Sequence, residues 1–201
     1  SRYSACSSIT ANDLLEYEAE AGVDGVVLTE HEQFWPESEF EALQRQHDDL
    51  VLFNGTEVRV GSLHHVLTLL PEPNPDLLSI EDPRGFIDRA RTLGGYLIAA
   101  HPFRFYDDYD QRNRDYRLDG VEVASRGMYR PGEENRARNL ARAWDADCFA
   151  NSDAHSPAPI GAFYCEIDGH PRTEADLLET LRSDGVQPVV RREQFPQSRY
   201  S

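Results

Sequence analysis

Histidine and acidic residues stand at the ends of several strand-length apolar segments of this chain. In a parallel β/α barrel the carboxyl ends of all strands meet on one face, so side chains far apart in the sequence can converge there. Imidazole nitrogens suit zinc, iron and other transition metals, and carboxylates also permit manganese. The pattern therefore predicts a divalent-metal site. Its candidate ligands are His31, Glu57, His65, His101, Asp153 and His155.

The elements that must position these residues alternate between strand and helix. Apolar strand patterns are predicted at 23–29, 50–53, 55–58, 65–70, 96–100, 120–124, 148–150, 162–167 and 186–190. Helical patterns are predicted at 10–21, 37–47, 80–93, 133–144 and 173–181. Six or seven such strand-helix units predict an α/β fold with a parallel sheet, close to a barrel.

The length and charge of the chain narrow the class of protein. Its 201 residues suffice for one domain with a sizeable core, which we place at residues 1–190, followed by a polar C-terminal tail at 191–201. Acidic residues outnumber basic ones 36 to 20, for a net charge of -16, and every basic residue is Arg. Such acidity is typical of halophile-like proteins, although codon bias is an alternative. It does not supply the basic face of a general nucleic-acid coat.

Compartment follows from the cysteines and from hydropathy. Cys6, Cys148 and Cys165 are odd in number and lack a C-x-x-C spacing, which argues against a disulfide framework. No run approaches 18 apolar residues and no signal peptide is evident, so we expect neither membrane span nor secretion. These features favour a reducing, cytoplasmic setting.

Several short motifs follow one another along most of the chain. They are Thr29-Glu30-His31, Gly55-Thr56-Glu57, His65-Val66-Leu67, Ala100-His101-Pro102, Gly120-Val121-Glu122-Val123, Asn135, and Ser152-Asp153-Ala154-His155 with Ile160-Gly161. In order and spacing this set resembles the PHP family, named for polymerase and histidinol phosphatase. The resemblance implies a distorted seven-stranded β/α (TIM-like) barrel that carries two or three divalent metal ions (Zn, Mn or Fe) and hydrolyses phosphate esters.

The resemblance also implies a role for each candidate ligand. His31 and His155 would bind one metal, His65 and His101 a second, and Glu57 would bridge. Asp153 would bind a third metal, and it and His155 would be the catalytic pair. Alternation along a strand points His64 and His65 to opposite faces, so only one of them can easily face the metals; we choose His65, with His64 as the alternative.

Two departures from the family pattern stand out. The family opens with a strand ending in His-x-His, followed by a loop similar to Ser1-Arg2-Tyr3-Ser4, so we expect the first barrel strand to be missing from this chain, through trimming or through degeneration. Glu30 stands where the family usually has Asp. Cys6 could bind metal as a thiolate, but a small buried residue is the favoured interpretation.

Arginines between residues 104 and 142 indicate where an anionic substrate would bind. This stretch holds nine Arg and eight acidic residues, so it is far less negative than the rest of the chain. We expect Arg104 and Arg126 to clamp phosphate, since a guanidinium matches phosphate bidentately. The alternative is that these arginines pair with nearby aspartates as surface charge.

The function predicted from the sequence is therefore a metal-dependent phosphoesterase. It would hydrolyse a small phosphate monoester or nucleotide through a metal-bound hydroxide. Its partner would be this small phosphorylated substrate, with no general nucleic-acid coat and no membrane. One alternative is a degenerate PHP-like scaffold or regulatory module without catalysis, and another is hydrolysis of a C–N bond. Glu122 either positions a ligand or water or has a structural role.

Overall fold

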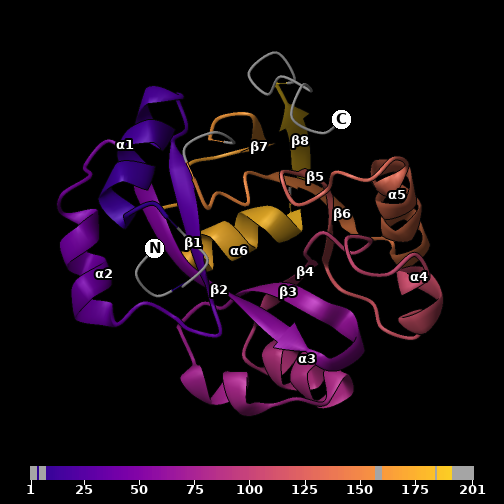
Figure 1. Cartoon of the computed structure of the whole chain (residues 1–201). Helices are drawn as coiled ribbons and strands as arrows, with labels where there is room; N and C mark the ends of the chain where they lie inside the picture. The colour runs from indigo at the N-terminus through magenta and orange to yellow at the C-terminus, as the bar shows by residue number, and fades with distance from the viewer. Residues whose placement is uncertain (1–3, 5–7, 157–159, 184, 192–201) are drawn as a thin grey trace.

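The computed structural model describes residue 4 and residues 8–156, 160–183 and 185–191. Six strands form one curled sheet in the order β1-β2-β3-β4-β5-β6, and β7 and β8 form a separate antiparallel pair (Figure 1). The strands are β1 (Gly25–His31), β2 (Val51–Val60), β3 (His64–Leu69), β4 (Tyr96–Ala99), β5 (Gly120–Ser125), β6 (Asp147–Asn151), β7 (Phe163–Ile167) and β8 (Val186–Val190). The α-helices are α1 (Ala11–Glu20), α2 (Glu37–Gln44), α3 (Pro83–Thr92), α4 (Tyr109–Arg112), α5 (Glu133–Trp144) and α6 (Glu174–Ser183).

The direction of β3 corrects the expectation of a parallel sheet. β3 runs antiparallel to both β2 and β4. Only the three-residue 3₁₀ turn η1 (Gly61–Leu63) joins β2 to β3, and a parallel pair needs a crossover of a dozen or more residues. The reversal brings the start of β3 to the edge where β1 and β2 end. His65 pairs with Arg59 in the register, two residues beyond Glu57, which itself pairs with His31.

The two faces of the sheet bury different sets of apolar side chains. Val58, Val66, Leu97 and Val121 belong to the cluster that also contains apolar residues of α3 and α5. Alternate positions on the same strands, among them Phe53, Leu69, Tyr96 and Ile98, pack against Leu177, Leu178 and Leu181 of α6. Burial of each such side chain stabilises the fold by roughly 1.5–3 kcal/mol. In Figure 1, α6 crosses the middle of the curled sheet, while α3 and α5 lie outside it.

Strand periodicity then places the candidate ligands above the α6 side of the sheet. Phe53 and Glu57 are four residues apart in β2, and Leu69 and His65 are four apart in β3, so each pair shares a face. On this face, an apolar layer packs against α6. Four residues further along each strand, a layer of imidazoles and carboxylates follows. This juxtaposition gives the ligands a rigid support.

Several predicted elements are confirmed, and the differences have local causes. Residues 133–144 and 186–190 form the helix and strand predicted for them. Thr10 caps α1, because its side-chain oxygen accepts a hydrogen bond from the backbone N–H of Asp13. The helix predicted at 80–93 begins at Pro83, because the side chain of Asp82 accepts from Gly85 N and caps it there. The strands predicted at 50–53 and 55–58 are one strand, and α4 was not predicted.

The α/β class is confirmed, and the barrel only in part. The described residues form a six-stranded half-barrel, in which the seventh barrel strand is not found. Ser1 to Tyr3, Cys6 and most of the predicted tail, 192–201, lie outside the described residues. None of the described helices combines the length and the apolar character needed to cross a bilayer.

Candidate metal centre

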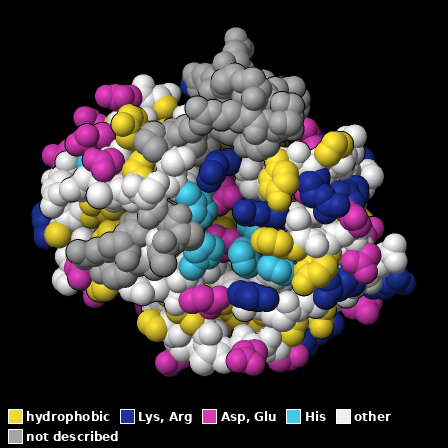
Figure 2. All heavy atoms as spheres, in the orientation of Figure 1, with side chains coloured by type: hydrophobic (Ala, Val, Ile, Leu, Met, Phe, Trp, Pro, Cys, Tyr) yellow, Lys and Arg dark blue, Asp and Glu magenta, His cyan; other side chains and the backbone are white. Residues whose placement is uncertain are grey.

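The centre is built around the buried carboxylate of Glu57, near the end of β2. Its Oε1 lies 2.7 Å from Nδ1 of His65 and 3.3 Å from Nε2 of His101, and its Oε2 lies 3.5 Å from Nδ1 of His31. Glu57 and His101 are almost fully buried, whereas His31 is one-third exposed. Four elements thus bring one carboxylate and three imidazoles together, and Figure 2 shows histidines gathered beside acidic side chains near the centre of this face.

The chemistry of Glu57, His65 and His101 fits a metal ion. These three residues offer one ligand atom each, all within 4.8 Å of one another. Glu57 Oε1 and His65 Nδ1 are buried close to each other, yet neither has a partner in hydrogen-bond geometry within the described part of the chain. Orphaned buried polar atoms are costly, and a cation between them would satisfy both. A carboxylate and two imidazoles are a donor set that zinc and related metals accept.

The electrostatics of the centre also favour a cation. Burial by itself would raise the pKa of Glu57, but its contacts with His101 and His65 hold that pKa well below its ordinary value. Burial would lower the pKa of His101, whereas the carboxylates of Glu57 and Glu122 raise it above its ordinary value. The pocket therefore stabilises positive charge on or between its imidazoles.

A second group of candidate ligands lies beside the first, after β6. Nδ1 of His155 is 3.0 Å from the backbone carbonyl oxygen of Asp153 and 3.4 Å from its carboxylate. A proton held on Nδ1 by that carbonyl leaves Nε2 free for a metal. The rings of His155 and His31 are 6.2 Å apart, centroid to centroid. Burial raises the pKa of Asp153, with His101 and His155 opposing the shift. The structure thus brings all six predicted ligands into one neighbourhood.

Glu122 accepts hydrogen bonds from a candidate ligand and from nearby residues. This carboxylate, fully buried in β5, accepts hydrogen bonds from His101 N (2.7 Å), Ser125 Oγ (3.0 Å) and Asn151 Nδ2 (3.0 Å). Burial raises its pKa to about 7. His101 has a φ of 30°, a conformation that is rare for residues other than glycine. Glu122 therefore holds the strained backbone from which the His101 imidazole projects.

In the loop after β5, Gly127 lies close to the side chain of Asp153. A Cβ atom on Gly127 would lie 2.7 Å from Asp153 Oδ2, 3.1 Å from His101 Cδ2 and 3.4 Å from Arg104 Nη1. No side chain fits at such a distance without displacing Asp153 or the loop. Sequence reasoning missed this residue, because the close approach exists only in the folded chain.

The arginines predicted to bind phosphate occupy different positions. Nη1 of Arg104 lies 3.7 Å from Asp153 Oδ2, so this guanidinium stands at the centre. Arg126 is half-buried immediately after β5, one residue before Gly127. Asp107, one of the aspartates considered as a partner, instead binds Arg136 Nη1 (2.7 Å) and Arg130 Nη2 (3.0 Å).

His64 takes no part in the group around Glu57. Its ring stacks on Phe105, with centroids 4.2 Å apart and an interplanar angle of 16°. Burial and the neighbouring charges of His65 and Arg59 lower the pKa of His64 to about 4. The adjacent histidine, His65, is the one whose Nδ1 faces Glu57.

A small cavity of about 110 Å³ adjoins the candidate ligands. Ser152, Asp153 and His155 line one side of it, and residues of β1, including His31, line another. Glu18 of α1 also reaches this cavity, and burial raises its pKa to about 7. No pattern in the sequence distinguished Glu18, which occupies an ordinary helical position. A wider open depression of about 450 Å³, lined by Pro71 and Arg182 among others, includes none of the candidate ligands.

Comparison with known proteins bears on the family. Residues 131–186 match a family model described as PHP-associated. A two-domain protein of Bacteroides vulgatus, containing a predicted PHP-like metal-dependent phosphoesterase, is similar in structure, with a TM-score of 0.64 at 18% identity over 88% of this chain and 60% of its own. Over residues 131–186 the chain is thus similar to a PHP-associated family, and its fold is similar to that of a protein with a predicted PHP-like domain.

Other solved structures share this fold. PsfC of Pseudomonas syringae matches with a TM-score of 0.63 and 17% identity, over 90% of this chain and 82% of its own. Endonuclease Q matches with a TM-score of 0.64 and 17% identity, over 93% of this chain and 56% of its own. The chain thus spans only 60% of the Bacteroides vulgatus protein and 56% of endonuclease Q. Among curated protein sequences, none matches it.

The endonuclease Q structure overturns one expectation. That protein is in complex with a 27-mer duplex that has an abasic lesion at the active site. The prediction of a small phosphorylated substrate and no general nucleic-acid coat is therefore wrong. Its physical basis was the net charge of -16, but a bound strand responds mainly to charges within a Debye length, about 10 Å. The net charge of the whole chain therefore does not exclude a nucleic-acid ligand.

Proposed function

We propose that this chain is a PHP-type metal-dependent hydrolase of phosphoric esters. The observation that supports the proposal is the group of imidazoles around Glu57, whose buried Oε1 and the adjacent His65 Nδ1 have no hydrogen-bond partner among the described residues. Phosphoester hydrolysis needs positive charge that neutralises the phosphate and a means of activating water. Divalent metal, when bound, supplies both.

The chain's own residues hold and orient the reacting groups. Glu57 directs Oε2 to His31 and Oε1 to His65 and His101, so these residues would hold metal ions on either side of the Glu57 carboxylate. Asp153 and His155 extend the donor set toward His31. Zinc, iron and manganese all accept this mixture of nitrogen and oxygen donors, and two or three ions of one or more of these metals complete the proposal.

Arg104 acts on the phosphate in this proposal. In the absence of substrate its guanidinium lies near the Asp153 carboxylate, which holds it at the edge of the centre. Two oxygens of a bound phosphate would accept hydrogen bonds from the guanidinium, which would stabilise the negative charge that develops during hydrolysis. Arg126, in the loop that carries Gly127, is a second candidate for the same contact.

The experiment that tests the function combines metal content with turnover. Elemental mass spectrometry on protein purified without a metal-affinity tag is expected to find about two or more transition-metal ions per chain. The loaded protein is then assayed with bis(4-nitrophenyl) phosphate, with single-stranded and duplex DNA, and with amide substrates. We expect phosphoester cleavage that is lost in His101→Ala and in Asp153→Ala. Activity that survives both changes, or cleavage of amides alone, would overturn the proposal.

A further inference from the structure

An exposed aromatic ring stands at the edge of the metal centre. Phe105 follows Arg104 in the segment between β4 and α4, and 46% of its surface is exposed. Only Tyr17 and Tyr129 are comparably exposed among the large hydrophobic side chains of the described residues. Single exposed apolar residues are common and by themselves mean little. The surroundings of Phe105 distinguish it.

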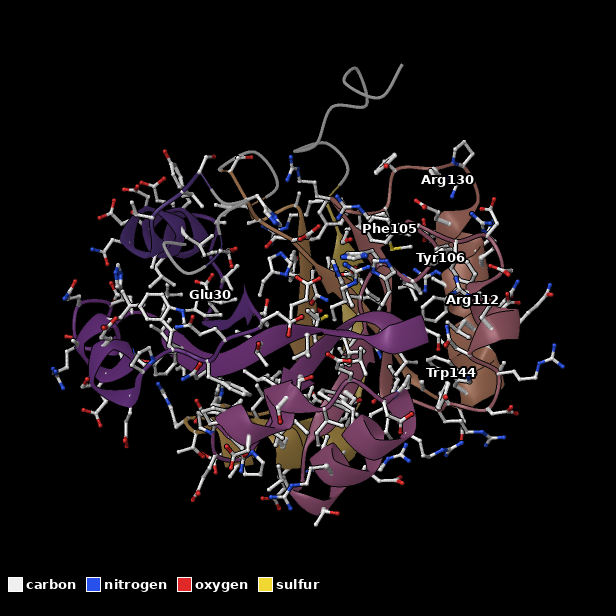
Figure 3. The ribbon with its side chains drawn as sticks, turned by 60° about the horizontal axis from the view of Figure 1, so that its bottom comes forward. Glu30, Phe105, Tyr106, Arg112, Arg130 and Trp144 are labelled. Atoms are coloured by element: carbon white, nitrogen blue, oxygen red, sulfur yellow. The ribbon has the colours of Figure 1, made fainter. Side chains whose placement is uncertain are left out.

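Other rings fix Phe105 relative to the candidate ligands. One ring face stacks on His64, at 4.2 Å between centroids. The ring also meets His65 and His101 edge-on, at 5.8 and 5.9 Å. Tyr106 packs against His64 at 5.4 Å, and Arg112 lies 4.0 Å from the Tyr106 ring centroid. Figure 3 shows Phe105, Tyr106 and Arg112 together on one side of the molecule. Phe105 is thus a rigid surface whose orientation is set by the metal-site histidines.

The guanidinium proposed to bind phosphate lies over this ring. The Arg104 guanidinium carbon is 5.3 Å from the Phe105 centroid, and its Nη1 is 3.7 Å from Asp153 Oδ2. A phosphoester held at the centre by Arg104 would therefore have its neighbouring organic group next to Phe105. In a nucleic-acid strand that group is a sugar with its base.

We propose that Phe105 is the platform on which a nucleobase next to the scissile phosphoester stacks. The inference rests on the proposed function and names the substrate class of the same site, an unpaired nucleotide of a nucleic-acid strand. The Phe105 ring has no hydrogen-bonding group, so it recognises a planar base of any identity. Because the platform is pre-organised, stacking does not require the ring to be ordered at the time of binding.

The test separates stacking from hydrolysis. The probe is a single-stranded, phosphorothioate-linked oligonucleotide that contains 2-aminopurine, whose emission falls when the base stacks. It is titrated into the full chain with bound zinc, and an abasic oligonucleotide of equal length competes for the site. Phe105→Leu is compared with Phe105→Trp, and with Tyr17→Leu as the matched loss of an exposed aromatic ring from α1.

We expect Phe105→Leu to weaken binding of the base-bearing strand about 10-fold and to leave the abasic competitor within twofold. Phe105→Trp should retain or strengthen the emission change, and Tyr17→Leu should match the unaltered protein. Absence of an emission change in the unaltered protein, or equal loss of both oligonucleotides in Phe105→Leu, would overturn the platform.

Failure of the platform and failure of the proposed function give different results. An emission change that depends on Phe105, in a protein that cleaves no phosphoester, keeps the platform and rejects the hydrolase. Phosphoester cleavage together with strand binding indifferent to Phe105 keeps the hydrolase and rejects the platform.

Discussion

Glu122 and His101 are joined by a hydrogen bond in which the backbone N–H of His101 donates to the buried Glu122 carboxylate at 2.7 Å. The bond fixes the residue at which β4 gives way to the loop that carries Arg104 and Phe105. Glu122 touches no reacting group in this arrangement. It is a positioning residue, and its effect on metal binding should pass through His101.

Replacement of Glu122 tests this relationship. Glu122→Leu leaves the N–H of His101 and the amide of Asn151 without their acceptor, and we expect a loss of about 3 kcal/mol in the free energy of unfolding, together with weaker metal binding. Glu122→Gln should retain most of both, because its carbonyl can accept from His101 while the Asn151 amide turns over. Denaturant unfolding and zinc titration give the two readouts. Equal loss in Gln and Leu variants would contradict the positioning role.

Removal of the Glu57 charge should abolish metal-dependent stabilisation. Zinc that binds only the native state raises the melting temperature, by an amount that grows with metal concentration. In Glu57→Gln we expect no such rise and fewer than one zinc ion per chain, because the negative charge is lost and an NH2 group, which cannot bind a metal, replaces one of the oxygens that face His65, His101 and His31. Differential scanning calorimetry with and without EDTA measures the effect. Glu41→Gln, which removes an exposed carboxylate of α2 paired with Arg45, is the control and should leave the rise unchanged.

Gly127→Ala should impair the centre more than it impairs folding. The added methyl would lie 2.7 Å from Asp153 Oδ2, so Asp153 or the loop must move. We expect at least a 10-fold fall in kcat with a change in stability of about 1 kcal/mol. Gly85→Ala in α3 is the matched control, since its Cβ meets nothing closer than 3.3 Å and a helical Gly→Ala change favours folding. Similar activity in the two variants would show that the close approach at Gly127 is unimportant.

The buried Glu18 should make stability depend on pH. Burial raises its pKa from 4.5 to about 7, so the native state keeps a proton that the unfolded chain releases at lower pH. Stability from this residue is therefore present below about pH 4.5 and falls as the pH rises to about 7. We expect Glu18→Gln to stabilise the protein at pH 8 by on the order of 2 kcal/mol and to have little effect at pH 4.5.

Urea unfolding in EDTA at the two pH values measures the contribution of Glu18 without metal. Glu16→Gln, in the same helix and exposed, is the control. A gain at pH 4.5 equal to that at pH 8 would contradict the assignment, because it would not reflect ionisation.

Asp107 should tie the Arg104–Phe105 segment to α5. Its carboxylate accepts from Arg136 and Arg130, whose hydrogen bonds lower the pKa of Asp107, and Arg130 also donates to the backbone oxygen of Phe103. Asp107→Ala should raise KM severalfold with little change in kcat, since the segment loses order rather than a reacting group. Steady-state kinetics checks the split, and Asp110→Ala on α4 is the exposed control. A fall in kcat alone would assign Asp107 a different role.

Patterns along the chain were enough to predict most strands and helices and the types of residue at the ends of the strands. Period-two apolar patterns in the sequence predicted most strands within a few residues. The expectation that His64 and His65 point to opposite faces is wrong, because His64 has a φ of 61° and the two rings lie 4.8 Å apart. The six ligand-type residues were visible because each interrupts an apolar pattern at a strand boundary. Local chemistry of this kind depends only on neighbours along the chain.

The way in which the strand ends and their side chains come together depends on tertiary packing. The antiparallel direction of β3 follows from the short η1 turn, and it brings the first residues of a strand to an edge formed elsewhere by strand ends. Gly127 approaches Asp153, which is 26 positions away along the chain, and His64 stacks on Phe105, which is 41 positions away. The raised pKa of Glu18 likewise depends on burial by residues distant in the sequence. Burial, distance and electrostatic coupling between such residues are properties of the packed chain, so no pattern along the sequence encodes them locally.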